Sequence, residues 1–143
     1  MGHSFTTFRN KHIRSKDYKI ETWLFLVVRE IDEFENCPSW LEESRHNWLE
    51  EAQLSLNGCM DLQFDKFLNS QEKVNLFREI CKEIIGKLES FGEKIPKDFL
   101  NELCGYKPPC DIKDDNQTQL YLSYGKALLK LLDGEQTEKL VNV

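Results

Sequence analysis

Residues 17–34 read DYKIETWLFLVVREIDEF, and the spacing of the apolar residues in this stretch decides the predicted fold class. The apolar residues recur at steps of three and four, which places them on one face of an α-helix: Ile20, Trp23, Leu24, Val27, Val28, Ile31 and Phe34. Phe25 and Leu26 widen that face until little polar surface remains, as is typical of a helix at the centre of a bundle. A buried strand over residues 23–28 is the alternative, because a short apolar run does not distinguish the two. The longer pattern on both sides favours the helix.

The same periodicity continues downstream and predicts further helices. Main helices are expected over about residues 39–56, 70–91 and 116–132, and short helices over 61–68 and 96–105. Ser39 with Glu42 three residues later has the spacing of a capping box, and Ser70 can cap the longest helix. Gly92 and Gly134 follow the last periodic residues, where glycine commonly ends a helix.

No segment shows a sustained two-residue alternation of apolar and polar residues, so a sheet is not needed to account for the apolar residues. The predicted fold class is therefore all-α: a single compact helical domain of about four main helices plus one or two short ones. This helical domain is expected to cover residues 17–134. Residues 1–16 are predicted to form an irregular basic arm, and residues 135–143 a C-terminal tail.

Size and composition predict a globular protein of the cytoplasm. The chain has 143 residues, of which 40% are hydrophobic, and its longest apolar run covers only residues 23–28, whereas a membrane span needs about 20 residues. The first residues do not read as a secretory signal segment. The five cysteines contain no C-x-x-C pair, which favours reduced thiols over disulfides or a zinc site.

The distribution of charge is the most informative polar feature. Residues 1–19 carry a formal charge of +4 in a chain whose net charge is −6, whereas residues 30–51 hold eight carboxylates and a single cation, Arg45. Several of these carboxylates lie at the expected C-terminal end of the first helix, where the helix dipole disfavours negative charge. Local conflicts of this kind are more common at functional sites.

Two interpretations of the acidic cluster remain open. It can be a solvated face that keeps the protein soluble, or a docking surface for a basic protein partner, with a tryptophan as an aromatic anchor. The predicted partner-binding residues are Glu30, Asp32, Glu33, Glu35, Trp40, Glu42, Glu43, Glu50 and Glu51.

Other chemistries have weaker support in the sequence. An isoelectric point near 5.1 argues against a nucleic-acid partner despite the basic arm. Glu43 and His46 have the Glu-x-x-His spacing of di-iron bundles, but such sites need a second pair. Ser4 beside His3, and Cys59 after a glycine, are the candidate nucleophiles, and neither belongs to a recognisable catalytic set. No metal and no cofactor are predicted.

The leading functional hypothesis is a non-catalytic acidic interaction protein that binds a basic protein partner. Its most concrete form is an immunity-type inhibitor of a bacterial toxin, a class that shares this general character. The alternatives are a metal-dependent helical-bundle enzyme that uses Glu43 and His46, and a structural subunit or homodimer without a catalytic role.

Overall fold

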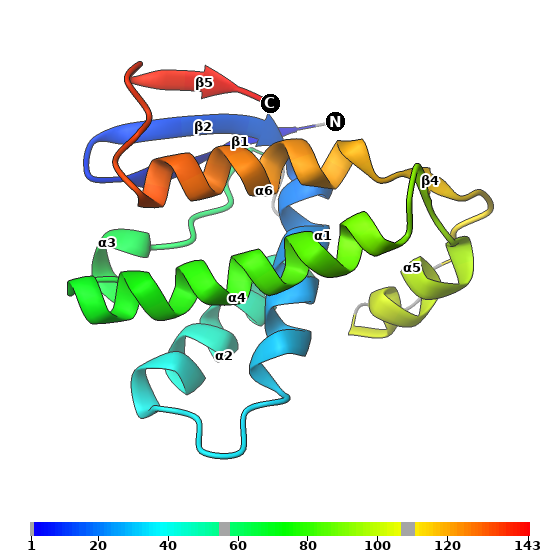
Figure 1. The fold of residues 1–143 in the computed structure, drawn as a ribbon, viewed down its shortest axis with the longest axis horizontal. Coiled ribbons are helices and arrows are strands. Elements are labelled where there is room, and N and C mark those ends of the chain that lie inside the picture. The colour runs from blue at the N-terminus through cyan, green and yellow to red at the C-terminus, as the bar shows by residue number, and fades with distance from the viewer. Residues whose placement is uncertain (1, 55–57, 107–110) are drawn as a thin grey trace.

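The computed structural model describes residues 2–54, 58–106 and 111–143, and within them the chain combines helices and strands (Figure 1). The helices are α1 Asp17–Ile31, α2 Ser39–Leu54, α3 Phe64–Phe67, α4 Gln71–Ser90, α5 Lys97–Leu103 and α6 Gln119–Leu132, with a 3₁₀ turn over Cys104–Tyr106. The strands are β1 His3–Phe8, β2 Lys11–Lys16, β3 Lys94–Ile95, β4 Asn116–Gln117 and β5 Leu140–Asn142. The all-α prediction is therefore wrong, because five strands in two sheets accompany the six helices of the described residues.

The larger sheet is built from the two ends of the chain, in the strand order β1-β2-β5. β1 and β2 form an antiparallel hairpin in which Phe5 lies opposite Arg14, and its two-residue turn is made by Arg9 and Asn10, both at positive φ. β5 then adds to β2 in parallel. The predicted irregular arm is thus a hairpin, and the predicted tail supplies a strand.

The hairpin was missed because its buried face is mainly polar, with Phe8 and Ile13 as its apolar members. Ser4 and Thr6 of β1 and Ser15 of β2 point inward, while Phe5 points outward with 50% of its surface exposed. Two of these hydroxyl groups have partners in the core: Ser4 Oγ donates to Asp17, and Thr6 Oγ1 lies 2.7 Å from the hydroxyl oxygen of the buried Tyr124. An apolar alternation, the usual sign of a half-buried strand, is therefore absent from the sequence.

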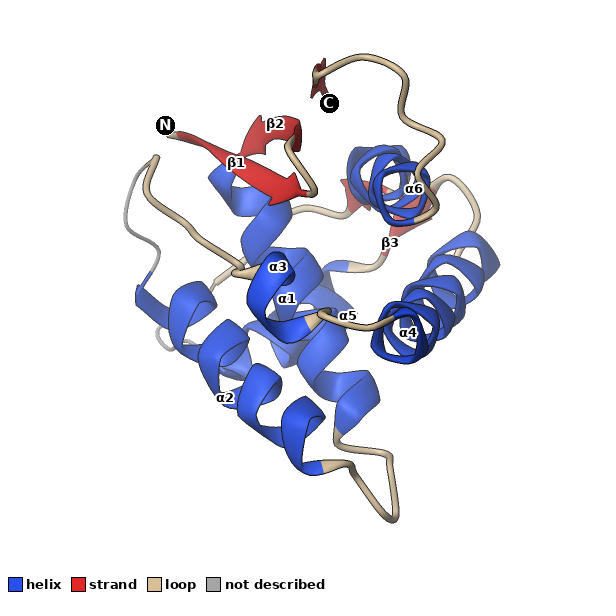
Figure 2. Cartoon of the chain, turned by 90° about the vertical axis from the view of Figure 1, so that its left-hand side faces the viewer, coloured by secondary structure: helices blue, strands red, loops and turns tan. Residues whose placement is uncertain are grey.

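The helices follow the predicted periodicity closely. α1 runs through the middle of the molecule, with α2 on one side and α4 and α6 on the other (Figure 2). Every side chain of the run 23–28 is buried, which confirms the central helix over the alternative strand. Ser70 Oγ accepts the backbone N–H of Lys73 at 3.3 Å and caps α4 as predicted. Ser39 is already helical, because the Pro38 carbonyl accepts the first N–H groups of α2, so the predicted capping box is off by one residue.

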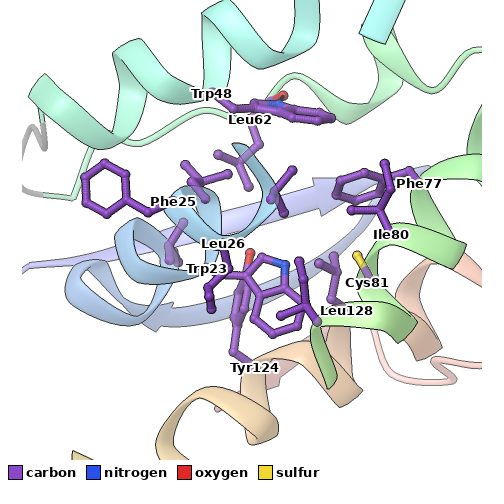
Figure 3. Close-up of a cluster of buried hydrophobic side chains, with 14 of the residues drawn as sticks. Trp23, Phe25, Leu26, Trp48, Leu62, Phe77, Ile80, Cys81, Tyr124 and Leu128 are labelled. Atoms are coloured by element: carbon purple, nitrogen blue, oxygen red, sulfur yellow. Dashed lines mark hydrogen bonds between the residues drawn. The ribbon is translucent and has the colours of Figure 1, made fainter. Parts of the chain in front are cut away.

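Two aromatic clusters fill the core (Figure 3). The Trp23 ring of α1 packs edge-on against Tyr124 of α6, with ring centroids 6.0 Å apart. Trp48 of α2 packs against Phe64 and Phe77, and its indole N–H donates to the Leu62 carbonyl at 2.8 Å. These contacts fix how α2, α4 and α6 sit around α1.

Candidate functional site

The eight predicted carboxylates lie at the end of α1 and along α2, with Glu50 and Glu51 near the C-terminal end of α2, and together with Trp40 they are called the acidic surface below. The corner where α1 ends and α2 begins lies at the opposite end of the molecule from the three-stranded sheet (Figure 1). The fold brings two lysines of α4 against the acidic surface, so that eight carboxylates face three cations, Arg45, Lys73 and Lys87. The surface therefore stays acidic, but it is less so than the sequence suggested.

Lys87 relieves the conflict with the α1 dipole. Its ammonium nitrogen lies 2.5 Å from Glu30 Oε1 and 3.8 Å from Glu33 Oε2. The Glu30 side chain is only 12% exposed, and its hydrogen bond raises the pKa of Lys87. Since a packed neighbour supplies the compensating charge, the position of Glu30 has a structural explanation.

A second ion pair ties the end of α1 to α2. Arg45 donates two hydrogen bonds to Asp32, with Nε 2.5 Å from Oδ1 and Nη2 3.2 Å from Oδ2. A guanidinium that donates to both oxygens of a carboxylate through two of its nitrogens holds that carboxylate in a fixed orientation. Asp32 thereby helps to fix the angle between the two helices.

Three other predicted residues contact neighbouring side chains or backbone groups of the protein. Trp40 is half-buried, and the Lys73 ammonium lies 5.6 Å from its ring centroid. Glu51 Oε2 accepts the Asp61 backbone N–H at 3.4 Å, and burial raises the pKa of Glu51. Glu50 lies 3.9 Å from the exposed ring of His46.

The remaining three predicted residues, Glu35, Glu42 and Glu43, are exposed and form no ion pair with any other described residue. Glu42 borders a hollow of about 380 Å³ at the α1–α2 corner. Ile31 and Phe34 give this hollow an apolar part, and Asp32 and Arg45 also line it. An open hollow with carboxylates beside an aromatic ring suits the long apolar stem and cationic head of a lysine or arginine.

Cys37 lines the same hollow but has no nucleophilic character. Burial raises the pKa of the Cys37 thiol, and the neighbouring Glu42 carboxylate raises it further. The reactive species of a cysteine is the thiolate, so this thiol stays protonated near neutral pH.

A groove of about 260 Å³ between α1, α4 and α5 was not anticipated from the sequence. Its apolar lining comes from Leu26, Ile84, Leu88, Phe91 and Phe99, and its polar lining from Arg29, Glu30, Glu33, Lys87 and Ser90. Phe91 and Phe99 are partly exposed, and their rings lie in tilted contact with centroids 4.9 Å apart. A local pattern does not show that α4 and α5 leave space between them.

The outer face of the larger sheet is the second polar feature of the molecule. β1, β2 and β5 contain no acidic residue, and Arg14 and Lys16 point outward beside Phe5. Leu140 of β5 is 41% exposed and lies opposite the His12 backbone. The basic character assigned to the first sixteen residues is therefore displayed on an ordered sheet.

The candidate nucleophile Ser4 belongs to a buried hydrogen-bond network. Its hydroxyl donates to Asp17 Oδ1 at 2.6 Å and accepts the Met60 backbone N–H at 3.1 Å. The other oxygen of Asp17 accepts the Gly58 N–H at 2.8 Å. These bonds join the hairpin, α1 and the loop before α3, so the Ser4 hydroxyl is used for structure.

The described residues contain no group of three or more histidine, cysteine, aspartate or glutamate side chains placed to bind a metal ion. None of the described helices combines the length and the hydropathy needed to cross a lipid bilayer. No protein-family model matches the chain, and neither a curated protein nor a solved structure shows significant similarity to it.

Proposed function

We propose that this chain is a non-catalytic interaction protein that binds a basic protein partner through the acidic surface at the α1–α2 corner. One concrete form of the proposal is an immunity-type inhibitor that neutralises a basic bacterial toxin in the cytoplasm. The observation that carries the proposal is the set of three exposed glutamates, Glu35, Glu42 and Glu43, which have no ion-pair partner among the described residues, and of which Glu42 lines a partly apolar hollow.

The energetics favour a role in recognition over a role in stability. Exposed carboxylates without ion-pair partners repel one another, although Glu42 gains from the dipole in the first turn of α2. A field of one sign speeds association with an oppositely charged protein. Asp32 and Glu30 are already paired with Arg45 and Lys87. We therefore expect the unpaired glutamates to govern the association rate, and the paired ones to keep the surface rigid.

Charge reversal tests the proposal. The triple variant Glu35→Lys, Glu42→Lys, Glu43→Lys is compared with a control, Glu93→Lys, Glu135→Lys, Glu138→Lys, which changes the net charge equally at exposed sites outside the acidic surface. Both variants and the wild type are used as tagged baits in the cells that produce the protein, with quantitative mass spectrometry and circular dichroism to verify folding.

The expected result is a basic protein that is captured by the wild type and the control and is lost with the first variant. Capture should also weaken as salt increases, because exposed charges are screened. A partner that binds the first variant as well as the wild type, or the absence of any specifically captured basic protein, would refute the proposal.

A further inference from the structure

The groove between α1, α4 and α5 adjoins the acidic surface. Glu30 and Glu33 belong to the acidic surface and also line the groove, and Asp32, between them in the sequence, lines the α1–α2 hollow. The lining residues of the groove come from the second half of α1, the end of α4 and α5, three elements that can be followed in Figure 1. A partner docked on the acidic surface would therefore reach the groove without a gap.

The floor of the groove is apolar and rigid. Leu26, Ile84 and Leu88 are core residues with at most 7% exposure, so they cannot turn away when the groove is filled. Phe91 and Phe99 add two partly exposed rings. Its volume of about 260 Å³ falls below the range of roughly 300–1,000 Å³ for small-molecule pockets, which favours a single large side chain over a cofactor.

The charged side chains at the rim of the groove determine which charge is favoured in the partner residues next to the bound side chain. Glu33 is 64% exposed, and among the described residues its one ion-pair partner is Lys87 at 3.8 Å, a distance at which a competing cation can take the place of Lys87. The Arg29 guanidinium is occupied, since it lies over the Phe99 ring at 5.1 Å and 3.5 Å from Glu102. Of the four charged side chains that line the groove, Glu33 is the most exposed, so the most accessible charge at the rim is a carboxylate.

From this arrangement we infer that the groove receives an apolar side chain, phenylalanine or leucine, from a segment of the basic partner whose neighbouring lysines or arginines lie on Glu33 and the acidic surface. This inference rests on the proposed function and adds the chemistry of the partner segment. Aromatic or aliphatic anchors seated in a preformed pocket typically dominate the binding energy of an interface.

Two synthetic peptides test the inference. One has phenylalanine between two pairs of lysines, the other has alanine in its place, and each is titrated into isotope-labelled protein followed by NMR. The phenylalanine peptide should bind about tenfold more tightly, as burial of a large apolar side chain predicts. Its chemical-shift changes should include Ser90 and Phe99.

Blocking the groove supplies the matched control. Ser90→Trp places a ring at the exposed edge of the groove, and Thr137→Trp makes a similar change at an exposed site outside it. The first variant should remove the tenfold advantage of the phenylalanine peptide and leave the alanine peptide unchanged. The second should leave both affinities unchanged.

The outcomes separate the two hypotheses. Equal binding of both peptides, or an advantage that survives Ser90→Trp, would overturn the groove inference while the acidic docking surface stands. Phenylalanine-peptide binding unaffected by the Glu35, Glu42 and Glu43 reversals would overturn both the inference and the proposed function. Failure of both peptides to bind at millimolar concentration would also overturn both.

Discussion

Gly125 is the position where a single added methyl group should be felt most strongly. It lies on the face of α6 that meets α1, and an ideal Cβ there would be 2.4 Å from Trp23 Cη2 and 2.6 Å from Trp23 Cζ3. Trp23 is 1% exposed and packs edge-on against Tyr124, so its ring has no free space to enter. Gly125→Ala must therefore push α6 away from α1 or strain the ring.

Two opposing contributions set the size of the effect. Replacing glycine by alanine inside a helix stabilises it by about 1 kcal/mol, whereas overpacking a core costs about 1–3 kcal/mol. Contacts this short against a buried ring place the cost near the upper end, so we expect a net loss of roughly 2 kcal/mol. Gly86 is the matched control, because it is exposed in α4 and its Cβ would meet nothing within 4 Å. Gly86→Ala should stabilise the protein by up to about 1 kcal/mol.

Urea denaturation followed by circular dichroism measures both variants. The helix contribution is common to both, so the difference between them, about 3 kcal/mol, isolates the clash with Trp23. Trp23→Phe removes the ring atoms nearest Gly125, and in that background Gly125→Ala should lose most of its cost in a double-mutant cycle. Gly125→Ala at least as stable as the wild type would refute the packing of α6 against α1 described above.

Three further predictions concern the sheet, the thiols and the acidic surface. Gln136→Ala removes a buried amide that donates to two backbone carbonyls near β5. The Val143 amide should then exchange with deuterium faster, while the α4 amides stay protected. Equally fast exchange at both places would contradict the role given to the Gln136 side chain. Alkylation of the native protein at pH 8 should modify the exposed Cys59 before Cys37, whose pKa is raised by burial, and peptide mass spectrometry showing the reverse order would count against this. Burial raises the pKa of Glu51, so its ionised form destabilises the fold; Glu51→Gln should raise stability at pH 7, with the gain vanishing as pH falls below the normal carboxyl range, and a loss at pH 7 would contradict the sign.

The candidate site shows which features of a charged surface can be predicted from residue patterns and which cannot. The acidic character of residues 30–51 can be predicted from the sequence, because it depends on composition alone. The sequence alone could not show that Lys87, far along the chain in α4, forms an ion pair with Glu30, or that Arg45 forms one with Asp32. Which carboxylates remain available to a partner is decided by contacts between elements.

Helices were predictable because their signals are local. The three-to-four spacing from Ile20 to Ile31 and the Ser70 cap each involve residues within a few turns of one another, and these features survive in α1 and α4. The hairpin lacked such a signal, since it buries Ser4 and Thr6 and exposes Phe5. Its stability depends on partners more than a hundred residues away, such as Tyr124.

The sequence by itself determined the helical segments, their buried faces and the acidic character of the α1–α2 region, since periodicity and charge are properties of neighbouring residues. Only the tertiary structure decided that both chain ends form one sheet, that a groove opens between α1, α4 and α5, and that three glutamates lack ion-pair partners among the described residues. These features arise where elements distant in sequence meet, and the energy of such contacts depends on geometry that no local pattern encodes.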